Sequence, residues 1–237
     1  MIETLRVGLE GLGIRYDERM AAKLIAYMER VLEWNGRVNM TAITDRGDFI
    51  VKHFLDSLVC HGWDEVARAE RVIDVGTGAG FPGVPLAILF PEKKFTLVDS
   101  LGKRVRIIQD LLGELEVGNV EAVHGRAEDL GNTKGYRERF ALCLSRAVAD
   151  LKILAEYCLP FVAVGGHFLA YKGGSPREEL EQAQNAIKKM GGKFLESREI
   201  TLDGGRISRS ILVIAKRSRT PKGFPRKAGT PERSPIV

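Results

Sequence analysis

Cysteine is scarce in this sequence, and its spacing excludes two kinds of site. The 237 residues include three cysteines, which lie in apolar surroundings and form no C-x-x-C pair: Cys60, Cys143 and Cys158. An odd number without metal-ligand spacing argues against a disulfide framework and against a zinc site. We therefore expect no metal, and we expect three thiols buried as small apolar side chains.

Long apolar runs are also missing. No stretch approaches the roughly 18 to 20 apolar residues that a membrane-spanning helix needs. The first twenty residues, MIETLRVGLEGLGIRYDERM, carry acids early and lack the apolar core of a signal peptide. These absences predict a cytoplasmic protein with no membrane partner. The length allows one sizeable core with a small appended segment.

Positive charge is unevenly distributed. The formal net charge is +5, but the stretch from Lys216 to the C-terminus holds seven Lys or Arg residues and one Glu, a net charge of +6. The rest of the chain carries 29 basic and 30 acidic residues. A basic segment without an amphipathic apolar face suits nucleic-acid phosphates better than a membrane. A solvated tail with no partner has the same composition, so both interpretations stay open.

The pattern of apolar residues divides the chain into three parts. Residues 1–64 form a helical segment, most clearly at 17–35, with Asp17 as the expected N-cap. Residues 65–216 alternate strands with helices and end in a hairpin through a DGG turn. Residues 217–237 form the basic tail. The expected strands are 71–75, 94–99, 119–124, 140–145, 166–171, 193–202 and 209–216.

Strands alternating with helices predict an α/β fold built from parallel βαβ units. Five parallel strands and a terminal antiparallel hairpin make a seven-stranded, mostly parallel, Rossmann-like sheet. This is the layout of class I methyltransferases, which depend on S-adenosylmethionine (AdoMet). We expect such a domain, preceded by the helical segment, in a monomeric protein.

The dinucleotide-binding pattern G-x-G-x-x-G is absent. Counted from Gly76, it requires glycine at position 81, where Phe81 stands. The stretch DVGTGAG has glycine at 76, 78 and 80, preceded by Asp74. The third glycine of the dinucleotide pattern serves a pyrophosphate. AdoMet has no phosphate and needs a loop that its amino-acid group can approach closely. The pattern therefore favours AdoMet, with Gly76 and Gly78 as contacts and with Asp74 attracting the cationic part of the ligand.

Two further segments extend this predicted cofactor site. Asp99 ends the second strand, 23 residues after Gly76, and is well placed for ribose hydroxyls. The segment GRAED follows the third strand, where loops commonly meet an adenine ring. We expect the adenine contact from Glu128, or from a backbone group of Ala127 or Glu128, and we expect His124 to be structural.

Two motifs for activating a methyl acceptor are absent. Enzymes that methylate exocyclic amines often carry (D/N)-P-P-(Y/F) after the fourth strand, where this sequence reads SRAVADL. Enzymes that methylate cytosine C5 need a cysteine nucleophile, commonly in Pro-Cys, and no Pro-Cys occurs. Guanine N7 fits what remains, because its lone pair attacks a methyl group without loss of a proton. Catalysis then rests on positioning and requires no general base.

Several segments along the chain are distinctive, above all the glycine stretch with its two prolines and the PRKAGTP tail. They are WNGRVNMTAI, KHFLDSL, DVGTGAGFPGVPLAI, LVDSLGKRVRII, NVEAVHGRAEDL, LSRAVADL and GFPRKAGTPERSPI. Through these segments the chain resembles, nearly end to end, the bacterial RsmG (GidB) family of 16S ribosomal RNA guanine-N7 methyltransferases. The resemblance implies transfer of a methyl group from AdoMet to N7 of a guanine in 16S ribosomal RNA or the 30S subunit. It also implies AdoMet contacts at Gly76, Phe81, Asp99, Ser100, Leu101, Ala127, Glu128 and Arg146.

Arg146 follows the fourth strand at the open edge of the sheet, where ligands bind in such folds. It could hold the methionine carboxylate of AdoMet or an RNA phosphate. Asn39 and His53 are pocket candidates from the N-terminal segment, although the structural role is favoured for each. The expected RNA contacts are basic residues beside the cofactor site and in the tail: Lys103, Arg104, Lys172, Arg226 and Lys227.

Two other functions are consistent with the sequence. One is an AdoMet-dependent methyltransferase with a different RNA or a small molecule as acceptor. The other is a non-enzymatic RNA-binding regulatory protein that keeps only the fold. The intact glycine loop argues against the second of these.

Overall fold

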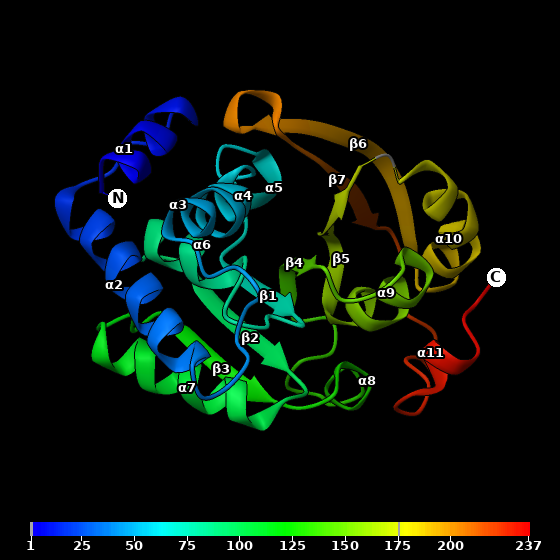
Figure 1. The fold of residues 1–237 in the computed structure, drawn as a ribbon. Coiled ribbons are helices and arrows are strands. Elements are labelled where there is room, and N and C mark those ends of the chain that lie inside the picture. Colours follow the sequence, from blue (N-terminus) through cyan, green and yellow to red (C-terminus); the bar gives the residue numbers. More distant parts are fainter. Residues whose placement is uncertain (1, 175) are drawn as a thin grey trace.

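A seven-stranded β-sheet runs through the molecule (Figure 1). The structure is a computed structural model, and it describes residues 2–174 and 176–237. In spatial order the strands are β3 (Val120–His124), β2 (Lys94–Asp99), β1 (Arg71–Val75), β4 (Phe140–Arg146), β5 (Val162–Gly173), β7 (Ile207–Lys216) and β6 (Gly192–Leu202). Neighbours from β3 to β5 pair in parallel, and β7 runs antiparallel to both β5 and β6. The prediction of a mostly parallel sheet with a terminal antiparallel hairpin is confirmed.

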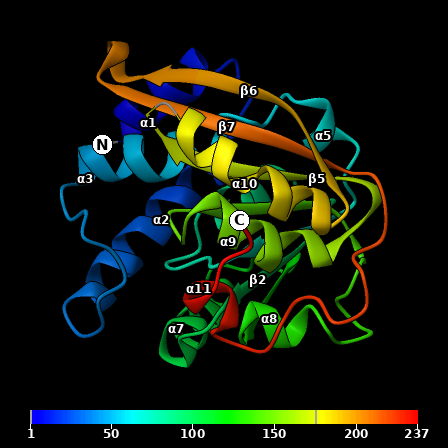
Figure 2. The same cartoon turned by 90° about the vertical axis from the view of Figure 1, so that its right-hand side faces the viewer.

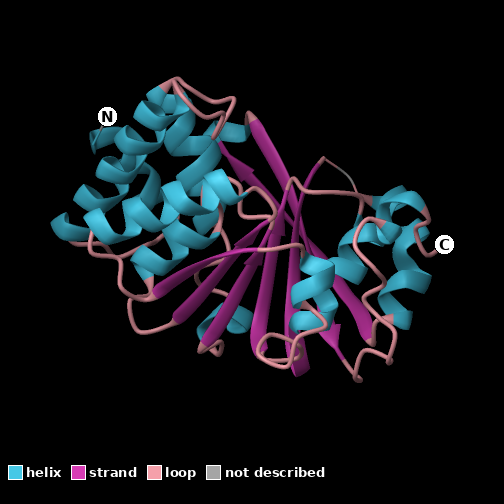
Figure 3. Ribbon diagram, turned by 90° about the horizontal axis from the view of Figure 1, so that it is seen from below, coloured by secondary structure: helices cyan, strands magenta, loops and turns pink. Residues whose placement is uncertain are grey.

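Helices cover both faces of the sheet (Figure 3). One face carries α1 (Ile2–Gly11), α2 (Glu18–Asn35), α3 (Arg46–Phe49), α4 (Asp56–Leu58), α5 (Asp64–Ala67), α6 (Gly83–Leu89) and α7 (Gly102–Glu114). The other carries α8 (Ala127–Leu130), α9 (Leu151–Cys158), α10 (Arg177–Lys189) and α11 (Thr230–Arg233). A π-helical turn, η1 (Ile50–Leu55), joins α3 to α4, and a 3-10 turn, η2 (Leu159–Phe161), precedes β5. A second 3-10 turn, η3 (Asp203–Gly205), closes the hairpin at the predicted DGG turn.

Alternate residues of the central strands enter two different hydrophobic cores. Val72 and Leu142 belong to the core beneath the N-terminal helices, whereas Ile73 and Cys143 belong to the core beneath α9 and α10. A parallel strand covered on both faces must be apolar on both. This explains why these strands read as short continuous apolar runs.

The N-terminal helices share a core with the sheet. Asp17 caps α2, as predicted, because its Oδ1 accepts a hydrogen bond from the Met20 N–H at 2.7 Å. Leu24 and Tyr27 on the apolar side of this helix are completely buried. The predicted burial of the three cysteines is also confirmed. Within residues 2–174 and 176–237, no helix is both long and apolar enough to cross a membrane.

The residues after β7 turn back across α8 and α9 (Figure 2). The Arg137 guanidinium donates hydrogen bonds to the carbonyl oxygens of Thr220 and Phe224 at 2.8 and 2.6 Å. Ile236 is buried in the second core. The division at residues 64 and 216 stays a prediction, but both end segments pack against the sheet domain.

Candidate active site

A cavity of about 760 Å³ opens at the carboxyl edge of the sheet. Its walls are the loops after β1, β2 and β4, the end of β5, the α3–α4 stretch and the loop that precedes this stretch. Ligands bind at this edge in open α/β sheets. The predicted site residues that line the cavity are His53, Gly76, Gly78, Phe81, Asp99, Ser100, Leu101, Arg104, Arg146 and Lys172.

The glycine loop after β1 brings bare backbone to the cavity. Gly76 and Gly78 have φ angles of 75° and 61°, in the left-handed region that favours glycine. A Cβ added at Gly76 would come within 2.3 Å of the Val148 side chain, whereas one added at Gly78 would meet no described atom within 4 Å. Because Gly78 also lines the cavity, a ligand can approach its backbone directly.

Asp74 has a different role from the predicted one. It is completely buried and lies beneath the glycine loop, outside the residues that line the cavity. Its Oδ2 accepts hydrogen bonds from the Thr77 hydroxyl at 2.7 Å and from the Gly83 N–H at 2.9 Å. Burial raises the pKa of the Asp74 carboxyl to about 6, against the opposing effect of these two bonds. Asp74 thus holds the loop in shape from beneath and is not exposed to the cavity.

Asp99 connects two loops of the cavity wall. Its Oδ2 accepts the Gly78 N–H at 2.9 Å, and its Oδ1 accepts the Leu101 N–H at 2.8 Å. A carboxylate has about four acceptor positions. Asp99 can therefore hold both backbone amides and still accept hydrogen bonds from a ligand in the cavity.

A buried acid that the sequence reasoning missed lies at the opposite wall. Asp56, which is completely buried, accepts a hydrogen bond from Arg146 Nη1 at 2.6 Å and another from Arg209 Nε at 2.8 Å. Arg146 also donates to the Lys52 carbonyl oxygen at 3.1 Å. Asp56 belongs to the distinctive segment KHFLDSL and comes three residues after His53, but that segment gives no indication of its arginine partners. No sequence pattern pointed to Arg209.

His53 packs flat against Phe81, with ring centroids 4.4 Å apart and ring planes 3° from parallel. Its Nδ1 accepts a hydrogen bond from Arg146 at 3.2 Å, so that the neutral ring carries its proton on Nε2, which lies 2.8 Å from the Thr41 hydroxyl. Burial, followed by the charge of Arg146, lowers the pKa of His53 to about 3. The ring is therefore neutral, and both its nitrogens are engaged.

Three other predicted residues lie outside the cavity lining. Asn39 is exposed, and its carbonyl oxygen accepts two hydrogen bonds from Arg104. Ala127 and Glu128 begin α8, and the Glu128 Oε1 accepts the Gly229 N–H at 2.8 Å. The loop before α8 is nevertheless joined to the cavity wall, because the Gly125 N–H donates to the Asp99 carbonyl oxygen at 3.1 Å.

The predicted RNA contacts fall into three groups. Lys103 and Lys227 are exposed. Arg104 and Lys172 line the cavity, and Lys172 Nζ donates to Glu179 and to the Ala149 carbonyl oxygen. The Arg226 guanidinium is bound to the buried carboxylate of Glu156. Lys103 and Lys227 are therefore best placed to meet a large external ligand.

Positive charge predominates around the cavity. Among the described residues that line it, five are basic and two are acidic: Lys52, Arg104, Arg146, Lys172 and Arg209 against Asp56 and Asp99. Four of the five basic groups are paired with acids: Lys52 with Asp48, Lys172 with Glu179, and Arg146 and Arg209 with Asp56. Arg104 donates to a carbonyl oxygen, which leaves its charge to attract a carboxylate or phosphate. Within the described parts of the chain, no group of three or more His, Cys, Asp or Glu side chains could hold a metal ion.

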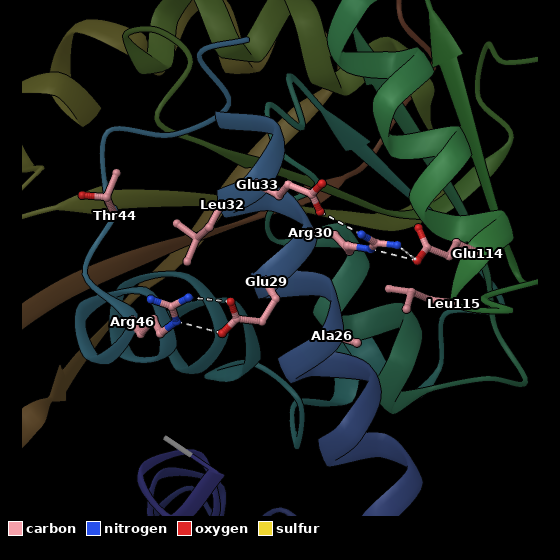
Figure 4. Close-up of a pocket in the computed structure, with 9 residues that line it drawn as sticks. All are labelled: Ala26, Glu29, Arg30, Leu32, Glu33, Thr44, Arg46, Glu114 and Leu115. Atoms are coloured by element: carbon pink, nitrogen blue, oxygen red, sulfur yellow. Dashed lines mark hydrogen bonds and ion pairs between the residues drawn. The ribbon is translucent and has the colours of Figure 1, made fainter. Parts of the chain in front are cut away.

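A second pocket, of about 710 Å³, lies between α2 and the end of α7 (Figure 4). Its charged side chains pair with one another: Glu29 with Arg46, and Arg30 with both Glu33 and Glu114. This pocket is formed by helices and a loop rather than by strand ends, where open α/β sheets bind their ligands. The cavity at the sheet edge is therefore the better candidate for the active site.

Comparison with known proteins identifies relatives along nearly the whole chain. Residues 20–203 match the GidB family model, described as rRNA small subunit methyltransferase G. A protein named ribosomal RNA small subunit methyltransferase G from Alkaliphilus metalliredigens is 47% identical over 232 residues, which cover 98% of this chain and 97% of that protein. A protein of the same name from Thermoanaerobacter pseudethanolicus is 42% identical over 235 residues, covering 99% and 98% of the two chains.

Solved structures share the fold at low sequence identity. An O-methyltransferase from Bacillus cereus in complex with SAH is similar with a TM-score of 0.56 and 16% identity, covering 91% of this chain and all of that one. A putative O-methyltransferase from Klebsiella pneumoniae has a TM-score of 0.56 and 15% identity, covering 89% and 94% of the two chains. These similarities support a class I methyltransferase fold.

Proposed function

The chain belongs to the GidB family, rRNA small subunit methyltransferase G, and on that premise we propose that it transfers the methyl group of AdoMet to N7 of a guanine in 16S ribosomal RNA. The observation that carries the cofactor assignment is the hydrogen bond from the Gly78 N–H to Asp99. Gly78 exposes its backbone to the cavity, and Asp99 holds that backbone while keeping acceptor positions for hydroxyl groups. An enzyme of the ribosome acts in the cytoplasm, and we propose that location.

The residues around the cavity fit AdoMet in distinct places. Asp99 would accept hydrogen bonds from the ribose hydroxyls, and Gly76 and Gly78 would lie along the methionine portion. Arg146 lies across the cavity, where its charge suits the methionine carboxylate. AdoMet, when bound, supplies a methyl group on a positively charged sulfur. The protein's task is to hold this group in line with the acceptor atom.

Guanine N7 suits a site without a free base. His53 is neutral and both of its ring nitrogens are engaged, so it is not available to remove a proton. N7 attacks through a lone pair and loses no proton, and its methylation therefore needs only orientation and exclusion of water. The flat pair of His53 and Phe81 gives one wall of the cavity a rigid shape.

The charge around the cavity supports RNA as the acceptor. Lys52, Lys172 and Arg209 line the cavity but are paired with acids, whereas Arg104 donates to a carbonyl oxygen. The charge of Arg104 suits a phosphate that flanks the target base. Exposed Lys103 and Lys227 would extend this contact beyond the cavity.

The decisive test is mass-spectrometric mapping of modified guanines in 16S ribosomal RNA from cells with and without the protein. We expect one N7-methylguanine to disappear without the protein and to return when purified protein and AdoMet are added to free RNA or to 30S particles. If labelled methyl is transferred to another RNA or to a small molecule instead, the proposed acceptor is wrong, but the assignment of AdoMet as cofactor still holds. Failure of the wild-type protein to bind AdoMet in calorimetry would favour a non-enzymatic RNA-binding protein.

A further inference from the structure

The C-terminal segment 220–233 is fastened to the domain through buried acidic side chains. Glu156 on α9 has an exposed fraction of 1%. Its Oε1 accepts the backbone N–H of Arg226 at 2.7 Å, and its Oε2 accepts from the Arg226 guanidinium at 2.7 Å. A further bond joins Arg226 Nε to Oε1 at 3.0 Å. This forked contact fixes both the side chain and the backbone of Arg226.

Three residues after Arg226, the same segment reaches α8. Glu128 has an exposed fraction of 2%, and its Oε1 accepts the Gly229 N–H at 2.8 Å. Asn132, just after α8, makes a second connection between α8 and this segment. Its Nδ2 donates to the carbonyl oxygens of Glu128 and Pro225, both at 2.9 Å. The segment therefore meets α8 and the residue that follows it through two backbone groups, the Gly229 N–H and the Pro225 carbonyl oxygen. Figure 2 shows the segment passing beside α8.

The loop that leads into α8 is in turn joined to the cavity wall. The Gly125 N–H donates to the Asp99 carbonyl oxygen at 3.1 Å, and the His124 ring lies 3.2 Å from the Ser100 carbonyl oxygen. Asp99 and Ser100 both line the cavity. Hydrogen bonds thus join the C-terminal segment to α8, the backbone leads from α8 back to Gly125 and His124, and hydrogen bonds join these two residues to the cavity wall.

We propose that segment 220–233 is a positioning element of the cofactor site, with Arg226 as the positioning residue that holds α8 in place for the adenine end of AdoMet. This inference rests on the proposed AdoMet site and on the sequence prediction that Ala127 and Glu128, which lie just outside the cavity lining, meet the adenine. It gives the basic segment a role that is separate from contact with RNA. Arg226 fixes the segment to α9 through Glu156, and the neighbouring Pro225 and Gly229 carry that position to Asn132 and α8. Arg226 lies outside the cavity lining.

Two neutralising substitutions in the same segment separate these roles. Arg226→Gln removes a charge together with the contact to Glu156, whereas Lys222→Gln removes an equal charge from an exposed side chain. We expect Arg226→Gln to raise the AdoMet Kd at least about fivefold, the low end of typical coupling between two sites. It should also speed hydrogen exchange of the amides of residues 125–132. Lys222→Gln should leave both measurements at wild-type values.

A third variant distinguishes position from charge. Arg226→Lys keeps the positive charge but cannot make the forked contact, so its AdoMet Kd should lie close to that of Arg226→Gln. Equal AdoMet Kd values for wild type, Arg226→Gln and Arg226→Lys would overturn the inference. If Arg226→Gln fails to fold, Glu156→Gln with its AdoMet Kd gives the same test, because it loses the charge of the contact but keeps an acceptor. Absence of AdoMet binding by wild type would instead overturn the proposed function itself.

Discussion

Asp56 and Arg146 form an ion pair with an O–N distance of 2.6 Å, in which the carboxylate is completely excluded from solvent. Asp56 comes from α4, Arg146 ends β4, and a second arginine, Arg209, reaches the same carboxylate from β7. One acid therefore joins the N-terminal helices to two strands of the sheet at the cavity wall. Removing its charge should affect both folding and ligand binding.

Replacing Asp56 with asparagine should destabilise the protein by about 3 kcal/mol or more, because two arginines lose the anion they share in a buried place. The AdoMet Kd should rise as well if Arg146 binds the methionine carboxylate. Urea unfolding and calorimetry measure the two effects. Asp48→Asn is the matched control, since it breaks an exposed pair with Lys52 and should cost less than about 1 kcal/mol.

Adding a methyl group at Gly78 should impair cofactor binding more than folding. A Cβ there would project into open space, and the positive φ would cost about 1–2 kcal/mol. Gly13→Ala is the matched control. Gly13 is far from Gly78 in the sequence, has a φ of 71° and has equally open surroundings, so its replacement carries the same backbone cost. We expect calorimetry to show a roughly tenfold or greater loss of AdoMet affinity for Gly78→Ala alone. Equal affinities for the two variants would place the cofactor elsewhere.

His53 should stay neutral from pH 8 down to pH 5, with no ring titration near 6.5 in NMR spectra. Its pKa of about 3 in the folded state lies below the ordinary value of 6.5. The neutral ring therefore contributes stability that is fully present above about pH 6.5 and is lost as the pH falls toward 3. In urea unfolding, the stability advantage of wild type over His53→Gln should shrink between pH 7 and pH 4.5. A constant difference across that range would contradict the neutral, buried assignment.

Asp74 should give the opposite pH dependence. Its pKa of about 6 lies above the ordinary 3.8, so its contribution to stability is present below about pH 3.8 and is lost as the pH rises through 6. Asp74→Asn keeps an oxygen for Thr77 and Gly83 but does not ionise. The unfolding free energy of this variant should rise relative to wild type by up to about 3 kcal/mol between pH 4 and pH 8. A difference that does not change with pH would show that Asp74 titrates normally.

Neutralising Lys103 or Lys227 should weaken binding to 16S ribosomal RNA without changing the AdoMet Kd. Each lysine that meets a phosphate releases about one counterion, so Lys103→Gln and Lys227→Gln should each reduce the salt-dependence slope by about 1. Filter binding over a range of salt concentrations measures this slope. Lys188→Gln, an exposed change in the last turn of α10, serves as the control. A slope that stays at the wild-type value in all three variants would exclude these two lysines from the RNA contact.

The fold could be predicted from the sequence because its signals are local. Alternation between short apolar runs and helical periods identified every strand, and DGG identified the final turn. The π-helical turn at Ile50–Leu55 gave no such signal. A π-turn differs from an α-helix by one residue in hydrogen-bond spacing, and the apolar pattern is too coarse to show that difference.

The site was only partly predictable, because some of its residues are close together in the sequence and others are far apart. The glycine loop and Asp99 belong to one βαβ unit, so their spacing carried the information. Asp56, Arg146 and Arg209 meet only after the sheet has formed, and nothing local relates them. Glu156 did leave a trace, as a single acid within the apolar helix LKILAEYC, but its partner Arg226 was assigned to RNA on composition alone.

The position of β7 determines how late in synthesis the sheet and the active site can form. β7 is the last strand to be made, yet it lies between β5 and β6 in the sheet. A nascent chain that ends before residue 207 has no partner for β6, and it leaves Asp56 without Arg209 and Glu156 without Arg226. The cavity wall is thus complete only when the residues from β7 onward are present, because β7 supplies Arg209. An unfinished chain would hold the whole glycine loop and still lack a complete active site.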